Sequence, residues 1–177
     1  MTSHDVGAIL PVHARFPDLL LTSLLLVSPV QAEEKIGDKV IKFDARDPEM
    51  NAAIMKAREA LPGFWQKFAQ PGPGENEFYL KVMIVEDGGS EHFWCGAIRG
   101  NAAAATCIIA NKPMFVTSVK FGERVTVNPD NISDWKYNLN GKIKGGETIR
   151  VMIGRMPEEE RAKYRELLVG GVEGYQK

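Results

Sequence analysis

Residues 77–110, EFYLKVMIVEDGGSEHFWCGAIRGNAAAATCIIA, contain the pattern that decides the fold of this chain. Glu77–Val85 is rich in aromatic and β-branched residues, which favour strands. Asp87–Ser90 has the composition of a turn, and His92–Ile98 and Thr106–Ala110 are predicted as two further strands. Three strands joined by short connections predict an antiparallel meander.

The strand pattern continues after Pro113. Asn140-Gly141 is the strongest local hairpin signal in the chain. The segments predicted to extend the sheet are Val116–Phe121, Arg124–Val127, Ile132–Leu139, Lys142–Lys144 and, as a final strand, Glu147–Ile153.

A helix is predicted before the sheet. Asp47-Pro48-Glu49 supplies an N-cap, a proline at the first helical position and an acid in the first turn. One buried face is marked by apolar residues at helical spacing, namely Met50, Ala53, Ile54, Ala57 and Leu61. Pro62-Gly63 is expected to end this helix, and Phe64–Phe68 to form a short second helical turn.

A second helix is predicted after the sheet. Pro157 and the acidic run Glu158–Glu160 open it, Tyr164, Leu167 and Leu168 face inward, and Gly170-Gly171 stops it. The whole pattern predicts an α+β fold, a single domain over residues 47–170 in which helices flank an antiparallel meander, followed by a tail from residue 171 to 177.

Residues 16–32, FPDLLLTSLLLVSPVQA, have the apolar core and cleavage site of a secretory signal peptide. The apolar run Leu19–Val27 is shorter than the roughly 20 residues that a membrane-spanning helix needs. We expect cleavage after Ala32, a tether over residues 33–46, and a periplasmic or secreted location. A buried core segment is the alternative, and a translation start at Val12 would give a more compact leader.

The composition of the remaining chain excludes several partners. Removing the leader takes away one basic and two acidic residues, which leaves equal numbers of each. A neutral chain without a basic run argues against nucleic acid or an anionic membrane as partner. No second apolar stretch is long enough to span a membrane.

The inventory of reactive side chains is small. His92 is the only histidine after the leader, and it is accompanied by two cysteines whose spacing matches no zinc motif. We therefore expect no metal and no cofactor, since no phosphate-binding or dinucleotide-binding glycine motif occurs either. A catalytic role for His92 is conceivable with Asp134 or Glu91, but no nucleophile elbow is present.

Several ordered phrases in the second half of the chain are similar to a known family. They are Glu91–Trp94, Val119–Val125, Ile132–Tyr137, Thr148–Val151 and Arg155–Glu159. Together they resemble the bacterial proteins grouped as domain of unknown function 2314, over roughly Met50 to Leu168. The resemblance implies a compact α+β domain that occurs alone or attached to other modules, and it brings no activity or catalytic residues.

The two cysteines are predicted to form a disulfide. In a hairpin centred on Asn101, Cys95 would lie opposite Cys107. Cross-strand neighbours lie about 4.5 to 5.5 Å apart, which suits a disulfide, and an oxidising compartment permits one. The alternatives are two buried free thiols and, with less support, a redox pair.

A second group of residues is a candidate binding surface. Large aromatic rings and charges of both signs recur in the phrases that carry the family resemblance, a mixture that is enriched at interfaces. The candidates are Trp94, Lys120, Asp134, Trp135, Tyr137 and Arg150. Core packing is the alternative for both tryptophans.

Two function classes follow. The first is an exported, non-catalytic binding or inhibitor-type protein that acts on an envelope protein or a small envelope ligand. The second is a hydrolase of envelope polymers that uses His92. An exposed aromatic patch without His92 would favour the first class, and convergence with His92 in a pocket would favour the second.

Overall fold

The computed structural model describes residues 47–171. The signal peptide and tether predicted for residues 1–46, and all of the predicted tail except Gly171, lie outside the described residues. The elements are α1 (Pro48–Ala69), β1 (Glu75–Glu86), β2 (Gly89–Gly100), β3 (Ala105–Ile109), β4 (Arg124–Val127), η1 (Pro129–Asn131), β5 (Ile132–Leu139), β6 (Lys142–Gly145), α2 (Glu147–Gly154) and α3 (Glu158–Arg165).

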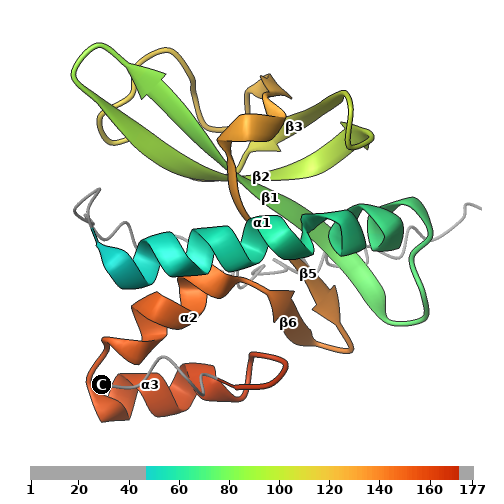
Figure 1. The fold of residues 1–177 in the computed structure, drawn as a ribbon, viewed down its shortest axis with the longest axis vertical. Coiled ribbons are helices and arrows are strands. Elements are labelled where there is room, and N and C mark those ends of the chain that lie inside the picture. The colour runs from blue at the N-terminus through green and yellow to red at the C-terminus, as the bar shows by residue number, and fades with distance from the viewer. Residues whose placement is uncertain (1–46, 172–177) are drawn as a thin grey trace, which may run out of the picture. The chain divides into compact units, whose positions relative to one another are not determined.

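The strands form one antiparallel sheet, and the predicted α+β fold is confirmed. Its order is β4-β3-β2-β1-β5-β6, so β1, β2 and β3 form the predicted meander, β4 extends it, and β5 adds on the other side of β1. A helix lies at each end of the described chain (Figure 1). The Asn140-Gly141 hairpin between β5 and β6 forms as expected.

Helix α1 begins as predicted but does not end at Pro62. The Asp47 carboxylate accepts the N–H groups of Glu49 and Met50 and caps the helix. A proline inside a helix costs about 3 kcal/mol, through a lost hydrogen bond and a clash. The next turn offsets this cost because Phe64 is fully buried and packs its ring against that of Trp135.

The predicted strand Glu147–Ile153 is wrong, because these residues form helix α2. Every residue from Thr148 to Gly154 is buried, so no polar face reveals the helical period, and the alternating β-branched residues resemble a strand. Gly145 and Gly146 both have positive φ and turn the chain away from β6.

Helix α3 forms as predicted after Pro157. Tyr164 is half-buried and Leu168 is buried, as expected. Leu167 is exposed, against the prediction, because the helix ends at Arg165 and the chain turns there, so that the N–H of Ile143 bonds to the Leu167 carbonyl.

The disulfide between Cys95 and Cys107 is present, but the register predicted for it is wrong. Cys95 lies opposite Ile109. The turn covers residues 101–104, because the Asn101 side chain accepts the N–H groups of two of the alanines in it, and this moves the turn centre past Asn101. A bulge at Ala97, with a φ of 45°, moves the pairing back by one residue, so that Cys95 meets Ile109 rather than Ala110. The disulfide therefore crosses diagonally, with a Cα–Cα distance of 5.5 Å.

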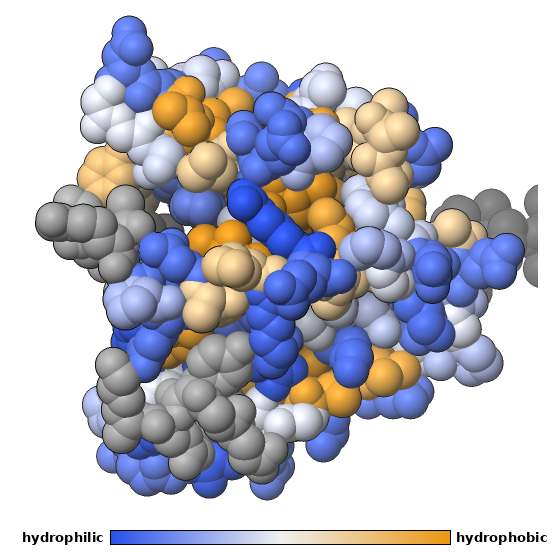
Figure 2. All heavy atoms as spheres, viewed as in Figure 1, coloured by the Kyte–Doolittle hydropathy of each residue, from blue (hydrophilic) through white to orange (hydrophobic). Residues whose placement is uncertain are grey.

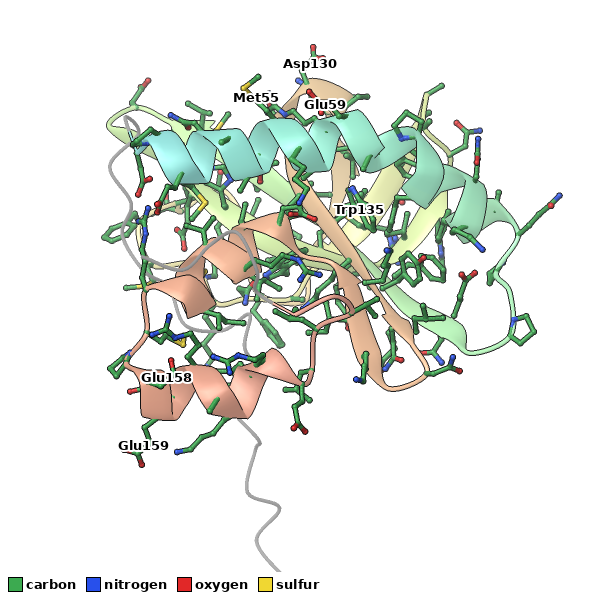
Figure 3. All side chains as sticks on the ribbon, turned by 60° about the horizontal axis from the view of Figure 1, so that its bottom comes forward. Met55, Glu59, Asp130, Trp135, Glu158 and Glu159 are labelled. Atoms are coloured by element: carbon green, nitrogen blue, oxygen red, sulfur yellow. A yellow bond between two sulfur atoms is a disulfide. The ribbon has the colours of Figure 1, made fainter. Side chains whose placement is uncertain are left out.

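The two faces of the sheet bury separate sets of side chains. On one face α1 covers the core that contains Phe64, Leu80, Trp135 and the disulfide. On the other face α2 and the segment after α3 cover Trp94. Figure 3 shows Trp135 lying between α1 and the sheet, with Met55 on the outer side of the same helix.

Candidate functional site

The structure places most of the predicted binding residues inside the protein. Trp94, Asp134, Trp135, Tyr137 and Arg150 are all buried, and only Lys120 is exposed. The buried tryptophans also lie on different faces of the sheet. These six side chains therefore do not form one common surface.

Trp135 and Tyr137 are part of the core beneath α1. The Trp135 indole N–H donates to the Ala57 carbonyl at 2.9 Å, and its ring stacks on that of Tyr137 at a centroid distance of 6.0 Å. A Trp135→Ala change would remove this packing, so its effect would report on folding before it reported on binding.

Trp94 lies on the opposite face, between two lysines. The Lys136 Nζ is 4.5 Å from the ring centroid and the Lys81 Nζ is 5.4 Å from it, both within cation–π range. The Lys136 ammonium also lies over the Tyr79 ring, at 5.2 Å. These contacts hold the lysines against the sheet.

Asp134 anchors the N-terminus of α2. Its carboxylate accepts the Thr148 N–H at 2.8 Å, the Thr148 hydroxyl at 2.6 Å and the Glu147 N–H at 3.2 Å. Lys81 donates to the Thr148 hydroxyl oxygen at 3.1 Å. Burial raises the pKa of Asp134 and lowers the pKa of Lys81. All these groups have partners, so the arrangement supports α2.

Arg150 holds the end of the described chain. Its guanidinium donates to the carbonyls of Gly145 and Val169, at 3.2 and 2.8 Å, and to that of Gly171. Its fork of donors is occupied by main-chain acceptors, which indicates a structural role for this residue.

His92 is half-buried and bonded to a serine. Its Nδ1 lies 2.8 Å from the Ser133 hydroxyl, which in turn lies 3.2 Å from the Lys81 carbonyl. A carbonyl only accepts, so the hydroxyl donates to it and Nδ1 carries the proton that bonds to Ser133. Burial, followed by the charges of Lys81 and Arg58, lowers the pKa of His92 to about 4.

Neither carboxylate suggested for catalysis bonds to His92 in the described structure. Asp134 accepts from the start of α2, and Glu91 accepts main-chain N–H groups of residues 114–116. Ser133 is buried and donates its proton to the main chain. The base, its orienting acid and an accessible nucleophile are therefore not assembled here.

The loop between β3 and β4 has a feature that the sequence did not reveal. We call residues 113–121 the clamped loop, because carboxylates from the β1–β2 hairpin bind its main chain. Glu91 accepts the N–H groups of Met114, Phe115 and Val116 at 3.0 to 3.2 Å. Glu86, at the end of β1, accepts the next two N–H groups, of residues 117 and 118.

The clamped loop has an inner and an outer side. Val116 and Val119 are buried and join the core that contains the disulfide. Met114, Phe115 and Phe121 are exposed by 58%, 52% and 61%. Figure 1 shows this part of the chain beside the tip of the β1–β2 hairpin. In Figure 2 hydrophobic side chains reach the surface at the same end of the molecule.

The only sequence signals for this site were two glutamates on a hairpin and a Pro113-Met114-Phe115 run without strand or helix periodicity. The prediction that Val116–Phe121 extends the sheet is wrong, because these residues pair with no strand within residues 47–171. The carboxylates of Glu86 and Glu91 accept the N–H groups that would otherwise donate to carbonyls of a neighbouring strand.

The described residues show neither a metal cluster nor a spanning helix. Within residues 47–171 no three His, Cys, Asp or Glu side chains gather closely enough to hold a metal ion. No helix in the same range is both long and apolar enough to cross a membrane.

Comparison with known proteins places the chain in a family. The profile of DUF2314, described as an uncharacterized protein conserved in bacteria, matches residues 47–170. Uncharacterized protein YegJ of Escherichia coli K12 is 30% identical over 151 residues, which cover 85% of this chain and 97% of that protein.

A second relative is longer. A putative ankyrin repeat protein of Neisseria meningitidis serogroup B is 33% identical over 138 residues, covering 73% of this chain and 54% of its own length. No solved structure matches this chain. The match to the family profile over most of the chain, together with the identity to YegJ over nearly its whole length, shows that the chain belongs to the bacterial DUF2314 family.

Proposed function

We propose that this chain is exported and binds another protein of the bacterial envelope without catalysis, with the clamped loop as its contact surface. The observation that carries the proposal is the fixed main chain of residues 114–118, bound to Glu86 and Glu91 beneath exposed apolar side chains.

A fixed loop favours binding for two physical reasons. Ordering a mobile loop costs free energy on association, and here the hydrogen bonds to Glu91 and Glu86 have already ordered it. The N–H groups are also paired, so covering them leaves no unsatisfied donor. Aromatic residues and methionine are enriched at the centres of interfaces.

The size of the exposed apolar surface fits a contact site. From the exposed fractions of Met114, Phe115 and Phe121, these side chains present roughly 400 Å² together, within the range of the largest patches on monomers, which are often functional. Such an area is small for a permanent complex and suits a limited contact that a few residues dominate.

The hydrolase alternative has less support. A base whose pKa is about 4 is weak at neutral pH, and the Ser133 proton already belongs to a main-chain hydrogen bond. The hydrogen bond to Ser133 and the partial burial of the ring explain the position of His92, so no catalytic role is needed to explain it.

Export rests on the leader and agrees with the disulfide. The apolar run Leu19–Val27 and the small residues before Glu33 support cleavage there. Cys95 and Cys107 are fully buried and bonded, which suits an oxidising compartment.

The test is site-specific photo-crosslinking in living cells. Benzoylphenylalanine replaces Phe121 or, as a matched control, Met55, which is 63% exposed on α1. We expect a discrete adduct with another envelope protein from position 121 only, unaffected by His92→Ala and lost with Met114→Ser. The N-terminus of the exported protein in this adduct should be Glu33. Absence of an adduct at 121, or the same adduct from position 55, would contradict the proposal.

A further inference from the structure

The charges around the clamped loop are arranged asymmetrically. Three carboxylates at this end of the molecule accept main-chain N–H groups of the loop. Glu86 and Glu91 do so as described above, and Glu123 accepts the N–H of Lys120 at 2.9 Å. Hydrogen bonds from the side chain of Ser118 and from the N–H groups of Thr117 and Ser118 lower the pKa of Glu86 to about 2.

The ammonium groups of the loop face the solvent instead. Lys112 precedes the loop, Lys120 lies near its end, and both are exposed. In the part of the chain that the structure describes, neither lysine forms an ion pair. The exposed side of the loop therefore combines apolar side chains with two ammonium groups that have no carboxylate partner among the described residues.

We infer that the partner is a protein whose contact surface is an apolar hollow bordered by carboxylates. This inference deepens the proposed function and rests on it. Met114 and Phe121 would enter the hollow, while Lys112 and Lys120 would meet the acidic border. Complementary charges at the rim of an interface speed association and orient the partners.

A second copy of the chain fits this surface poorly. Homodimers usually have two-fold symmetry, in which the same patch meets itself. The lysines on the edge of the loop would then face lysines. The apolar area is also below what a stable dimer buries.

An anionic lipid surface is also less suitable. Two lysines contribute only about 1 kcal/mol each at such a surface, and the exported chain has no net charge to add to them. A main chain fixed at five consecutive N–H groups lowers the entropy cost of fitting into a shaped hollow. It offers no such advantage against a fluid bilayer, which adapts its own shape. Asp87, exposed at the neighbouring hairpin tip, would oppose insertion.

The test combines charge reversal with the photo-crosslinking assay. The full precursor with benzoylphenylalanine at position 121 is expressed in three forms, namely with both native lysines, with Lys112→Glu and Lys120→Glu, and with both lysines changed to arginine. We expect the double reversal to lower the adduct yield about tenfold and the arginine pair to retain it. Melting temperatures of the purified forms should agree, because both side chains are exposed.

The possible results separate the inference from the proposed function. An adduct whose yield ignores charge reversal overturns the acidic partner and leaves protein binding in place. No adduct in any form removes the proposed function itself. An adduct of twice the mass of the chain identifies a second copy and overturns the inference. If no protein adduct forms and the purified protein instead sediments with phosphatidylethanolamine–phosphatidylglycerol vesicles in a Phe121-dependent way, the partner is a lipid surface and the inference is overturned.

Discussion

The depressed pKa of His92 predicts that this protein loses stability between neutral pH and about pH 4. The folded protein releases the His92 proton at about pH 4, whereas the unfolded chain does so near 6.5. As the pH falls, the unfolded chain binds the proton first. The free energy of unfolding contributed by this ring is therefore complete above 6.5 and is lost as the pH approaches 4.

The size of the effect follows from the two values. A difference of about 2.5 pH units, at 1.36 kcal/mol per unit, corresponds to about 3 kcal/mol, and the partial exposure of the ring makes this an upper value. The measurement is urea unfolding at about pH 7.5 and about pH 4, followed by tryptophan fluorescence, on the native protein and on His92→Asn. The asparagine amide can donate to Ser133 but does not titrate.

Asp134 and Glu86 titrate alike in both proteins, so their contributions cancel in the comparison. We expect the native protein to lose up to about 3 kcal/mol more than the variant between the two pH values. Equal pH dependence in the two proteins would refute the claim that burial lowers the pKa of His92, and His92 would again be a candidate general base.

Three further predictions concern the disulfide, the start of α2 and the clamped loop. Replacing Cys95 and Cys107 by alanine should lower the free energy of unfolding by about 3 kcal/mol, measured by urea unfolding, and an unchanged value would contradict this. Asp134→Ala should destabilise by about 3 to 5 kcal/mol, measured as a fall in melting temperature, because the buried start of α2 loses its acceptor and the half-buried Lys81 loses its nearby carboxylate. Glu91→Gln should speed hydrogen exchange at the amides of residues 114–116 with little change elsewhere. Exchange at these amides that is no faster than in the native protein, or that rises equally over the whole chain, would argue against the clamp.

The elements that carry their own local signal could be predicted from the sequence. Asp47-Pro48 marks the start of α1, and Asn140-Gly141 marks the β5–β6 hairpin. The disulfide partners were also predictable, although the turn at Asn101 was placed incorrectly and the pair is diagonal. Local turn chemistry predicts that the chain reverses near Asn101, but the exact turn residues and the bulge at Ala97 together decide the register.

What could not be predicted depends on contacts between distant residues. Helix α2 depends on a carboxylate from β5, Asp134, at its N-terminus, and no local pattern announces that contact. The clamped loop depends on Glu86 and Glu91, which precede it by more than twenty residues. Trp94 and Trp135 matched an interface composition, yet the same rings serve equally well in a core, and burial decides between the two.

The central claim is that the clamped loop is the contact surface, and an affinity measurement tests it most directly. The partner recovered through position 121 is purified, and its dissociation constant is measured for the native protein and for Met114→Ser combined with Phe121→Ser. Both side chains are exposed, so the melting temperature should hold. We predict that binding weakens about a hundredfold, as expected when the central residues of an interface are lost. An unchanged dissociation constant would contradict the account.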